Sequence, residues 1–222
     1  MTSDEDWADI QADLGEPTAT KPVPPERYDQ YAHIFPPLLF RFWKTYGFAG
    51  FLDGRYWLCD PAEWQPVVDA WTANLDLAMG TDTWHAIVRT AFGELFLWGE
   101  RTGCSLSIDP VYGHIYPAVG SHDRMASERS RDIQIEVAVS GGSIMKADLL
   151  GSDGKHLFAR ALKKHGPVGP DTMYTFVPAY HLGGPLTVDH IEIADATTHV
   201  ALLAQLSPHR VMGDITIGRS HD

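Results

Sequence analysis

Apolar residues recur along this chain with two spacings, one typical of helices and one typical of strands. Trp64, Val67, Val68 and Trp71 repeat at helical spacing and mark one buried face. The preceding segment Asp60-Pro61-Ala62-Glu63 offers an N-cap carboxylate, a proline at the first helical position and a glutamate that can reach back to the cap. We therefore predict a helix that begins at residue 61.

Four further helices are predicted from similar evidence. An apolar run follows Pro36-Pro37 and ends at Gly47, and this arrangement of proline and glycine suits a short buried helix. The other three are an acidic helix near residues 4–13, an amphipathic helix at 155–164 and an apolar helix at 198–206. Because a proline-rich stretch follows the acidic helix, we expect that helix to be loosely attached.

Short alternating segments with turns between them predict an antiparallel sheet. They lie at residues 55–58, 84–91, 94–98, 104–108 and 112–116. Hairpins at such short spacing favour an α+β domain with helices on one face of the sheet. Residues 133–139 (Ile-Gln-Ile-Glu-Val-Ala-Val) alternate strictly and are predicted as a strand on the same criterion.

The chain becomes polar between residues 121 and 132, and helix and strand patterns occur on both sides of this segment. A length of 222 residues with 44% hydrophobic side chains suffices for two cores. We predict an α+β protein of two small domains, each a mainly antiparallel sheet packed with helices. The predicted boundaries are 1–23 for the acidic helix and linker, 24–120 for the first domain and 125–212 for the second.

Acidic residues outnumber basic ones, with 29 carboxylates against 17 Lys and Arg and a formal net charge of −12. A surface this negative repels phosphate backbones, which argues against direct binding to nucleic acid and favours a basic protein partner. The first twenty residues contain six acids and no Lys or Arg, since Lys21 is the first basic residue of the chain. Such an acidic segment is either simply solvated or helps to steer a partner.

Motifs for catalysis and metal binding are missing from the sequence. Cys59 and Cys104 form no Cys-x-x-Cys pair, and we expect both to be small core residues. None of the eleven histidines lies three to five residues from another, which excludes a helical two-histidine zinc site but leaves open a site built from distant histidines. We predict no cofactor, no metal and no catalytic residue. The sequence shows no secretion signal and no apolar run of about 18 residues, so the expected location is the cytoplasm, away from the membrane.

One group of polar residues in the first half forms a candidate ligand cleft. Alternation along the strand predicted at 84–91 places His85 and Arg89 on one face, and Glu94 at the next hairpin position is expected to pair with Arg89. These three side chains together suit binding of a small anion or acid–base chemistry. An ordinary ion pair between two strands on a solvated face explains the same residues.

Two long segments in each half resemble a known family. Residues 43–71 and 90–98 resemble the GAD-like domain family, which is named for its similarity to a domain of glutamyl-tRNA amidotransferase. Residues 157–184 and 199–206 resemble a small domain that commonly follows it. This pairing is similar to the immunity proteins of type VI secretion DNase effectors described in Agrobacterium. The sequence departs from the family pattern at Tyr180-His181-Leu182, where relatives show an apolar segment.

The resemblance implies a non-enzymatic protein that binds a cognate DNase effector toxin and protects the cell's own DNA. Binding through a few aromatic anchors surrounded by acids would suit a basic nuclease. The candidate anchors and acidic neighbours are Tyr46, Phe48, Trp57, Tyr174 and Tyr180, with Asp53, Asp60 and Glu63. Core packing is the alternative role for each aromatic residue.

Two other function classes stay open at this stage. The first is a small-molecule or nucleotide-binding module without catalysis, which would use His85, Arg89 and Glu94. The second is a hydrolase, which is the weaker alternative because no spacing of nucleophile, base and orienting group is found.

Overall fold

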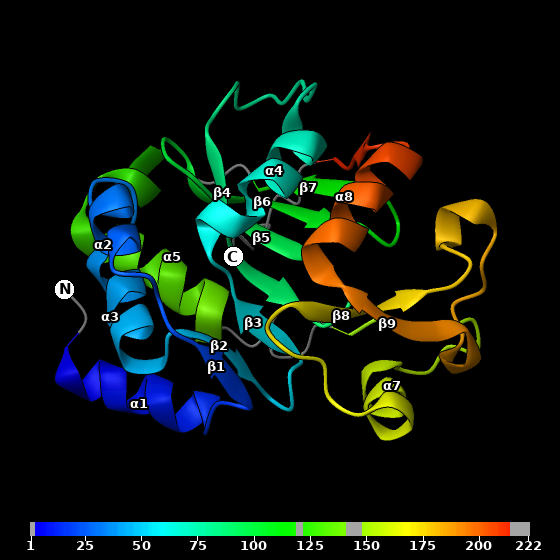
Figure 1. Ribbon diagram of the computed structural model, residues 1–222. Coiled ribbons are helices and arrows are strands. Elements are labelled where there is room, and N and C mark those ends of the chain that lie inside the picture. Colours follow the sequence, from blue (N-terminus) through cyan, green and yellow to red (C-terminus); the bar gives the residue numbers. More distant parts are fainter. Residues whose placement is uncertain (1–2, 119–121, 141–147, 214–222) are drawn as a thin grey trace, which may run out of the picture.

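A mostly antiparallel sheet of eight strands runs through the computed structural model, which describes residues 3–118, 122–140 and 148–213 (Figure 1). Neighbouring strands are antiparallel except that the last strand pairs in parallel with β7. In spatial order the strands are β1 (Ala19–Lys21), β2 (Phe48–Phe51), β3 (Tyr56–Leu58), β4 (Trp84–Thr90), β5 (Leu95–Gly99), β6 (Gly103–Asp109), β7 (His114–Pro117) and β10 (Arg210–Val211). A second sheet pairs β8 (Thr172–Phe176) with β9 (Ile191–Asp195).

Helices begin and end close to the predicted positions over most of the chain. Pro37 occupies the first turn of its helix, and the Asp60 carboxylate accepts a hydrogen bond from the Ala62 backbone N–H as the predicted N-cap. The α-helices are α1 (Asp4–Leu14), α2 (Glu26–Tyr31), α3 (Pro37–Tyr46), α4 (Pro61–Thr72), α5 (Glu128–Ser140), α7 (Phe158–His165) and α8 (Ala196–Leu206), and the short 3-10 helices are η1 (His122–Met125), η2 (Tyr180–Leu182) and η3 (Val188–His190). The predicted α+β class is confirmed.

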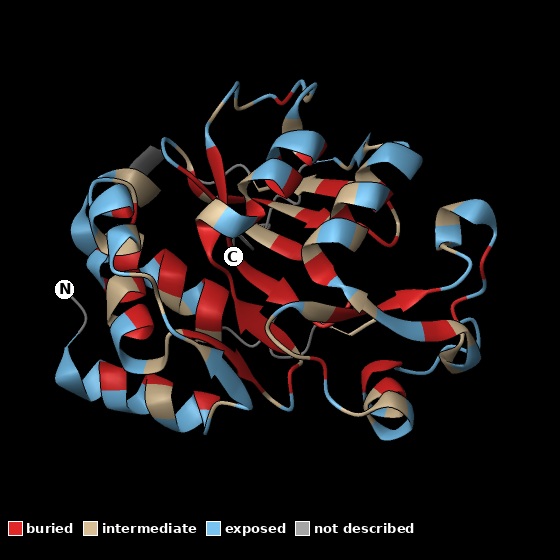
Figure 2. Cartoon of the chain, viewed as in Figure 1, coloured by how far each residue is buried: buried red, intermediate tan, exposed pale blue. Residues whose placement is uncertain are grey.

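Helices cover both faces of the large sheet, whereas the sequence predicted them on one face. On β5, Leu95 and Leu97 pack with α4 and α8, while Trp98 packs with α1, α3 and α5 in a separate core. The two helices α4 and α8 lie side by side on one side of the strands, and the buried positions concentrate on the sheet and on the helix faces turned toward it (Figures 1 and 2). Alternation within a strand therefore serves two cores, because both sets of side chains are buried.

The strand predicted at residues 133–139 is wrong, since these residues lie in α5. The buried apolar positions are Ile135, Ala138 and Val139, which follow helical spacing, whereas Ile133 and Val137 are exposed. Gln134 is buried as well, because its amide oxygen accepts from the Cys104 backbone N–H and its amide nitrogen donates to the Arg124 carbonyl. Because a polar residue occupies one buried position of this helical face, the apolar residues alone alternate as they would in a strand.

The acidic helix α1 is firmly attached, in contrast to the loose attachment predicted from the sequence. Its residues Trp7, Ile10 and Leu14 are buried in the core beside α3 and α5, and the Trp7 ring meets Phe42 edge-to-face at 5.0 Å between centroids. Within the stretch expected to be a linker, β1 joins the edge of the large sheet beside β2. Apolar residues at helical spacing within an acidic sequence were the signal for this packing.

The second half of the chain packs directly on the first. The Tyr174 backbone N–H donates to the Ala91 carbonyl, and the Trp71 indole N–H donates to the Val200 carbonyl in α8. A third core joins Phe92 and Val111 of the large sheet's turns to α7, β8 and β9. The predicted domain boundaries stay a prediction, and the end of the first predicted domain at 119–120 lies outside the described residues. Each of the contacts described above joins a segment before the predicted boundary to a segment after it.

Candidate partner-binding surface

Arg89 is a fully buried arginine that joins the two halves of the chain. Its Nη2 donates to the carbonyl oxygens of Gly169, Pro170 and Thr172 at 2.9, 2.8 and 3.1 Å. The guanidinium also lies over the Trp57 ring, 5.4 Å from its centroid. Burial lowers the pKa of Arg89 to about 10, which still leaves it charged near neutral pH. The role of Arg89 is therefore to hold the loop before β8.

The predicted ion pair between Arg89 and Glu94 is wrong. Leu95 is the residue opposite Arg89 in the β4–β5 register, and the Thr90 backbone N–H donates to the Glu94 carbonyl across the turn. Because adjacent residues of a strand project to opposite faces, this register points the two side chains apart. A tight turn that starts one residue earlier than predicted accounts for the difference.

His85 lies apart from both residues, so the three do not form the single cleft predicted. Its Nδ1 is 2.9 Å from the Gln65 amide oxygen, and its Nε2 is 2.9 Å from a Glu100 carboxylate oxygen. The ring is buried and contacts Tyr31 and Phe35 edge-on. His85 thus has hydrogen-bond partners for both ring nitrogens within the fold.

The predicted aromatic anchors divide between the core and the surface. Phe48, Trp57 and Tyr174 are buried in the interior, so core packing, the alternative role, is the one that the structure gives them. Tyr46 is half-buried, and its hydroxyl accepts from the Gln11 amide. Tyr180 is 44% exposed on η2, which leaves it as the predicted anchor with the most accessible ring.

The predicted acidic neighbours also differ in their surroundings. Asp53 is exposed in the turn between β2 and β3, where its backbone φ is 59°. Asp60 is buried and accepts from the Arg27 Nε at 2.8 Å in addition to capping α4. Glu63 pairs with Lys21 at 2.8 Å, and Lys21 also pairs with Asp171 of the second half. Asp53 is thus the freely accessible carboxylate among the three.

An acidic cleft lies where β5 and β6 meet the start of the second half. It encloses about 470 Å³, and its lining residues are Thr90, Phe92, Glu94, Phe96, Asp109, Val111, Tyr112, Asp148, Leu149 and Leu150. Leu95 and Ile108 are paired across the two strands, which makes Glu94 and Asp109 neighbours on one face. We refer to this cavity as the junction cleft.

Burial changes the titration of both carboxyl groups in the junction cleft. It raises the pKa of Glu94 to about 8, with a further rise caused by the negative charge of Asp109. It raises the pKa of Asp109 to about 6, although hydrogen bonds from the Tyr112 and Val111 backbone N–H groups oppose this rise. Near neutral pH the two groups therefore share less than two full negative charges.

Aromatic side chains form one rim of the junction cleft. The Tyr112 ring meets the Tyr180 ring edge-to-face at 5.2 Å and stacks on His114 at 5.7 Å. The sequence patterns pointed to Glu94 and Tyr180 for separate reasons and gave no indication of Asp109 or Tyr112. The signal that could have found Asp109 was the β5–β6 register, since extending the predicted pairing places it opposite Glu94.

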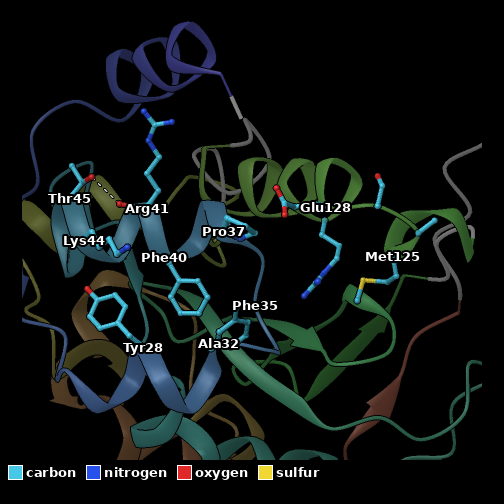
Figure 3. Close-up of a pocket in the computed structure, with 13 residues that line it drawn as sticks. Tyr28, Ala32, Phe35, Pro37, Phe40, Arg41, Lys44, Thr45, Met125 and Glu128 are labelled. Carbon is cyan, nitrogen blue, oxygen red and sulfur yellow. Dashed lines mark hydrogen bonds between the residues drawn. The ribbon is translucent and has the colours of Figure 1, made fainter. Parts of the chain in front are cut away.

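A larger groove lies between α2, α3 and α5 and has a different chemistry. It encloses about 750 Å³ and is lined by the rings of Tyr28, Phe35 and Phe40. Figure 3 shows these rings between the helices, with Lys44 close to Tyr28 and Glu128 across the groove. The Lys44 ammonium lies 6.0 Å from the Tyr28 ring centroid. We refer to this cavity as the aromatic groove.

The solvent side of α1 forms an acidic surface. Its carboxylates are all exposed, and Asp4 is held by Arg41 at 2.8 Å. The exposed acids in and just after this helix are Asp4, Glu5, Asp6, Asp9, Asp13 and Glu16. Trp7, Ile10 and Leu14 fix the opposite side, so these charges are presented from a rigid element.

The described residues include neither a cluster of metal-ligating side chains nor a helix suited to span a membrane. Within these residues, no three His, Cys, Asp or Glu side chains gather closely enough to hold a metal ion. In the same parts of the chain, no helix is long and apolar enough to cross a membrane. Cys59 is buried, which raises the pKa of its thiol to about 12 and agrees with the predicted core role.

Comparisons with known proteins support the resemblance seen in the sequence. Residues 7–112 match the family model of the GAD-like domain, and residues 145–207 match that of the T6SS immunity protein Tdi1, C-terminal. The layout of two domains is consistent with these two matches. The crystal structure of Atu4351 from Agrobacterium tumefaciens has a similar fold, with a TM-score of 0.79 at 22% identity over 95% of this chain and 93% of that one. A comparison with curated proteins gave no match.

The two family matches also indicate the kind of role to consider. The match to the C-terminal region of a type VI secretion immunity protein supports an immunity role for this chain. The structural likeness to Atu4351 shows the fold alone at this level of identity.

Proposed function

We propose that this chain, which joins a GAD-like domain to a Tdi1-type C-terminal domain, is an immunity protein that binds and neutralises a cognate type VI effector toxin. The match of residues 145–207 to the Tdi1 C-terminal model carries the proposal. The finer part of the proposal is that the toxin is a DNase. The chain then acts by binding, without turnover of a substrate, and works in the cytoplasm where the cell's DNA lies.

The charge distribution supports a DNase as the target. A nuclease needs a positive groove for its polyanionic substrate, and a protein with a net charge of −12 is attracted to such a groove. The acidic surface of α1 and the junction cleft offer carboxylates in rigid surroundings. Binding through preorganised groups avoids part of the entropy lost when flexible partners associate.

Co-expression tests this function directly. Cells that express the cognate effector toxin are expected to survive when this chain is produced and to lose chromosomal DNA when it is not. The purified proteins should form a complex that weakens as salt rises, because the attraction between charged surfaces is screened. Failure of the two proteins to bind even at low salt would contradict the proposal.

The aromatic groove favours a second candidate function, a binding module for a small planar anion. The Lys44 ammonium and three aromatic rings line the same cavity, and Lys44 lies close to the Tyr28 ring. The sequence placed small-molecule binding on the face that carries His85. In this second candidate function, the aromatic groove is the binding site instead. Thermal shift with nucleotides and aromatic carboxylates tests it, with Lys44→Ala as the variant that should lose any stabilisation.

A further inference from the structure

We infer that the junction cleft receives the side chain of an arginine or lysine from the effector toxin. The inference rests on the proposed function and names a contact point for it. It is carried by three observations on the described residues: a carboxylate without a partner, a cavity lining without a basic side chain, and aromatic surface suited to a cationic group.

Glu94 is the carboxylate that the fold leaves without a partner. No hydrogen bond or ion pair reaches its side chain from any described residue, although the group lines the cavity beside Asp109. The other two carboxylates in the cleft do have partners. Asp109 accepts from two backbone N–H groups, and Asp148 accepts from the Phe158 backbone N–H at the start of α7.

Among the described residues, the lining of the junction cleft contains three acids and no Lys, Arg or His. A carboxylate held largely away from water without a counter-charge is unfavourable, and a cation that enters the cavity would offset much of the lost solvation. Arg89 cannot serve, because the register directs it away and its Nη2 is engaged by three carbonyl oxygens. No described Lys or Arg therefore neutralises Glu94, and we assign that role to a cationic side chain of the toxin.

The size and the walls of the cavity suit a side chain better than an isolated ion. Phe92, Phe96 and Tyr112 supply aromatic surface on which a guanidinium can stack. The methylene groups of an arginine or lysine would contact Leu149 and Val111 while the charged end approaches Glu94. The exposed Tyr180 next to Tyr112 extends this surface toward the partner.

Cation binding in the cleft is coupled to loss of a proton. Because burial holds the pKa of Glu94 at about 8, an incoming cation must displace the proton that the carboxyl group carries at neutral pH. The complex should therefore become tighter between pH 6.5 and pH 8.5. The other titratable groups around Glu94 are Asp109, Asp148, Tyr112, Tyr116 and, beside Asp109, His181.

Glu94→Gln tests the inference, since it removes the charge and keeps the shape. We expect the dissociation constant for the purified toxin to rise by about 10- to 100-fold, as for other lost buried charge pairs. Asp76→Asn is the matched control: it removes one exposed charge beyond α4, in the connection that leads to the far end of β4. The control should change affinity by less than about two-fold, apart from general screening.

The outcomes separate the inference from the proposed function. If the toxin binds the wild type and Glu94→Gln equally well, with both proteins folded by circular dichroism, the inference is wrong and the immunity function stands. If the toxin does not bind the wild type, the proposed function fails. N-acetyl-arginine amide then tests the junction cleft without the toxin. Thermal stabilisation of the wild type but not of Glu94→Gln supports the inference, and equal shifts of the two proteins overturn it.

Discussion

Arg89 and Glu94 are ionisable residues five positions apart on one hairpin, yet their surroundings are opposite. Arg89 is surrounded by carbonyl oxygens and two tryptophan rings, so the fold itself supplies its partners. Glu94 lines a cavity and has no such partner among the described residues. The comparison teaches that a buried charge with internal partners stabilises the fold, whereas one without them marks a place for a ligand.

Removing Arg89 should have the largest effect on stability. In Arg89→Met, the carbonyls of Gly169, Pro170 and Thr172 lose their shared donor, and we expect unfolding to require about 3 kcal/mol less free energy. Urea denaturation followed by tryptophan fluorescence measures the change. Arg89→Lys should recover only part of it, because a compact ammonium cannot replace a planar guanidinium. Unchanged stability of the Met variant would show that Arg89 does not hold this loop.

Removing the carboxyl group of Glu94 should raise the free energy of unfolding, whereas removing Arg89 lowers it. The change at Glu94 should also be the smaller of the two. The folded state raises the pKa of this carboxyl from 4.5 to about 8, so it retains a proton that the unfolded chain releases. The free energy of unfolding of the wild type should therefore fall as pH rises from about 4.5 to about 8. At pH 8.5, Glu94→Gln should be more stable than the wild type by about 2 kcal/mol, the scale of a buried unpaired polar group.

A profile of the free energy of unfolding from pH 5 to pH 9 separates the contribution of Glu94 from that of Asp109. Asp109 contributes in a lower window, between 3.8 and about 6, because its pKa is raised less. The fall above pH 6 should thus be absent from Glu94→Gln and retained in Asp76→Asn. Parallel profiles for the wild type and Glu94→Gln would show that Glu94 titrates normally.

The sequence predicted regular structure well where local signals and burial agreed. Asp60 before Pro61 predicted the start of α4 correctly, because capping depends on neighbouring residues alone. The alternation at 133–139 misled, because Gln134 is buried by partners on β6 and η1 that lie far away in the sequence. The register of β4 and β5 likewise depends on a turn whose exact start the sequence did not show.

The candidate site was less predictable than the fold. The sequence patterns pointed to Glu94 and Tyr180. These two residues belong to one site only because Asp109 and Tyr112 lie between them, and no motif distinguished either of those residues. The junction cleft forms only when residues 148–150 pack over the hairpins of the first half. A site made from two segments so far apart in the chain leaves little trace in either one.

Helix α5 at residues 128–140 allows a direct test of the observed helix against the predicted strand. The Asp132 carboxylate accepts from the Leu38 backbone N–H at the start of α3, so Asp132→Ala should lower the free energy of unfolding by about 1 kcal/mol. Ile133→Ala, at an exposed position of the helix, should change it by less than about 0.5 kcal/mol. A large loss from the Ile133 variant would favour the strand predicted from the sequence.

The acidic surface of α1 should have the smallest effect on stability and act mainly on association. Asp9→Asn with Asp13→Asn should change the free energy of unfolding by less than about 0.5 kcal/mol. Stopped-flow mixing with the toxin should show slower association at low salt and no difference at high salt. Equal rates at all salt concentrations would exclude steering and leave the solvated alternative.

The most direct test of the proposed function is a titration of the purified cognate effector toxin with this chain. Plasmid cleavage should fall linearly and stop at one equivalent, as expected for a stoichiometric inhibitor that binds far more tightly than the concentrations used. Full cleavage in the presence of excess chain, with both proteins folded, would contradict the immunity function.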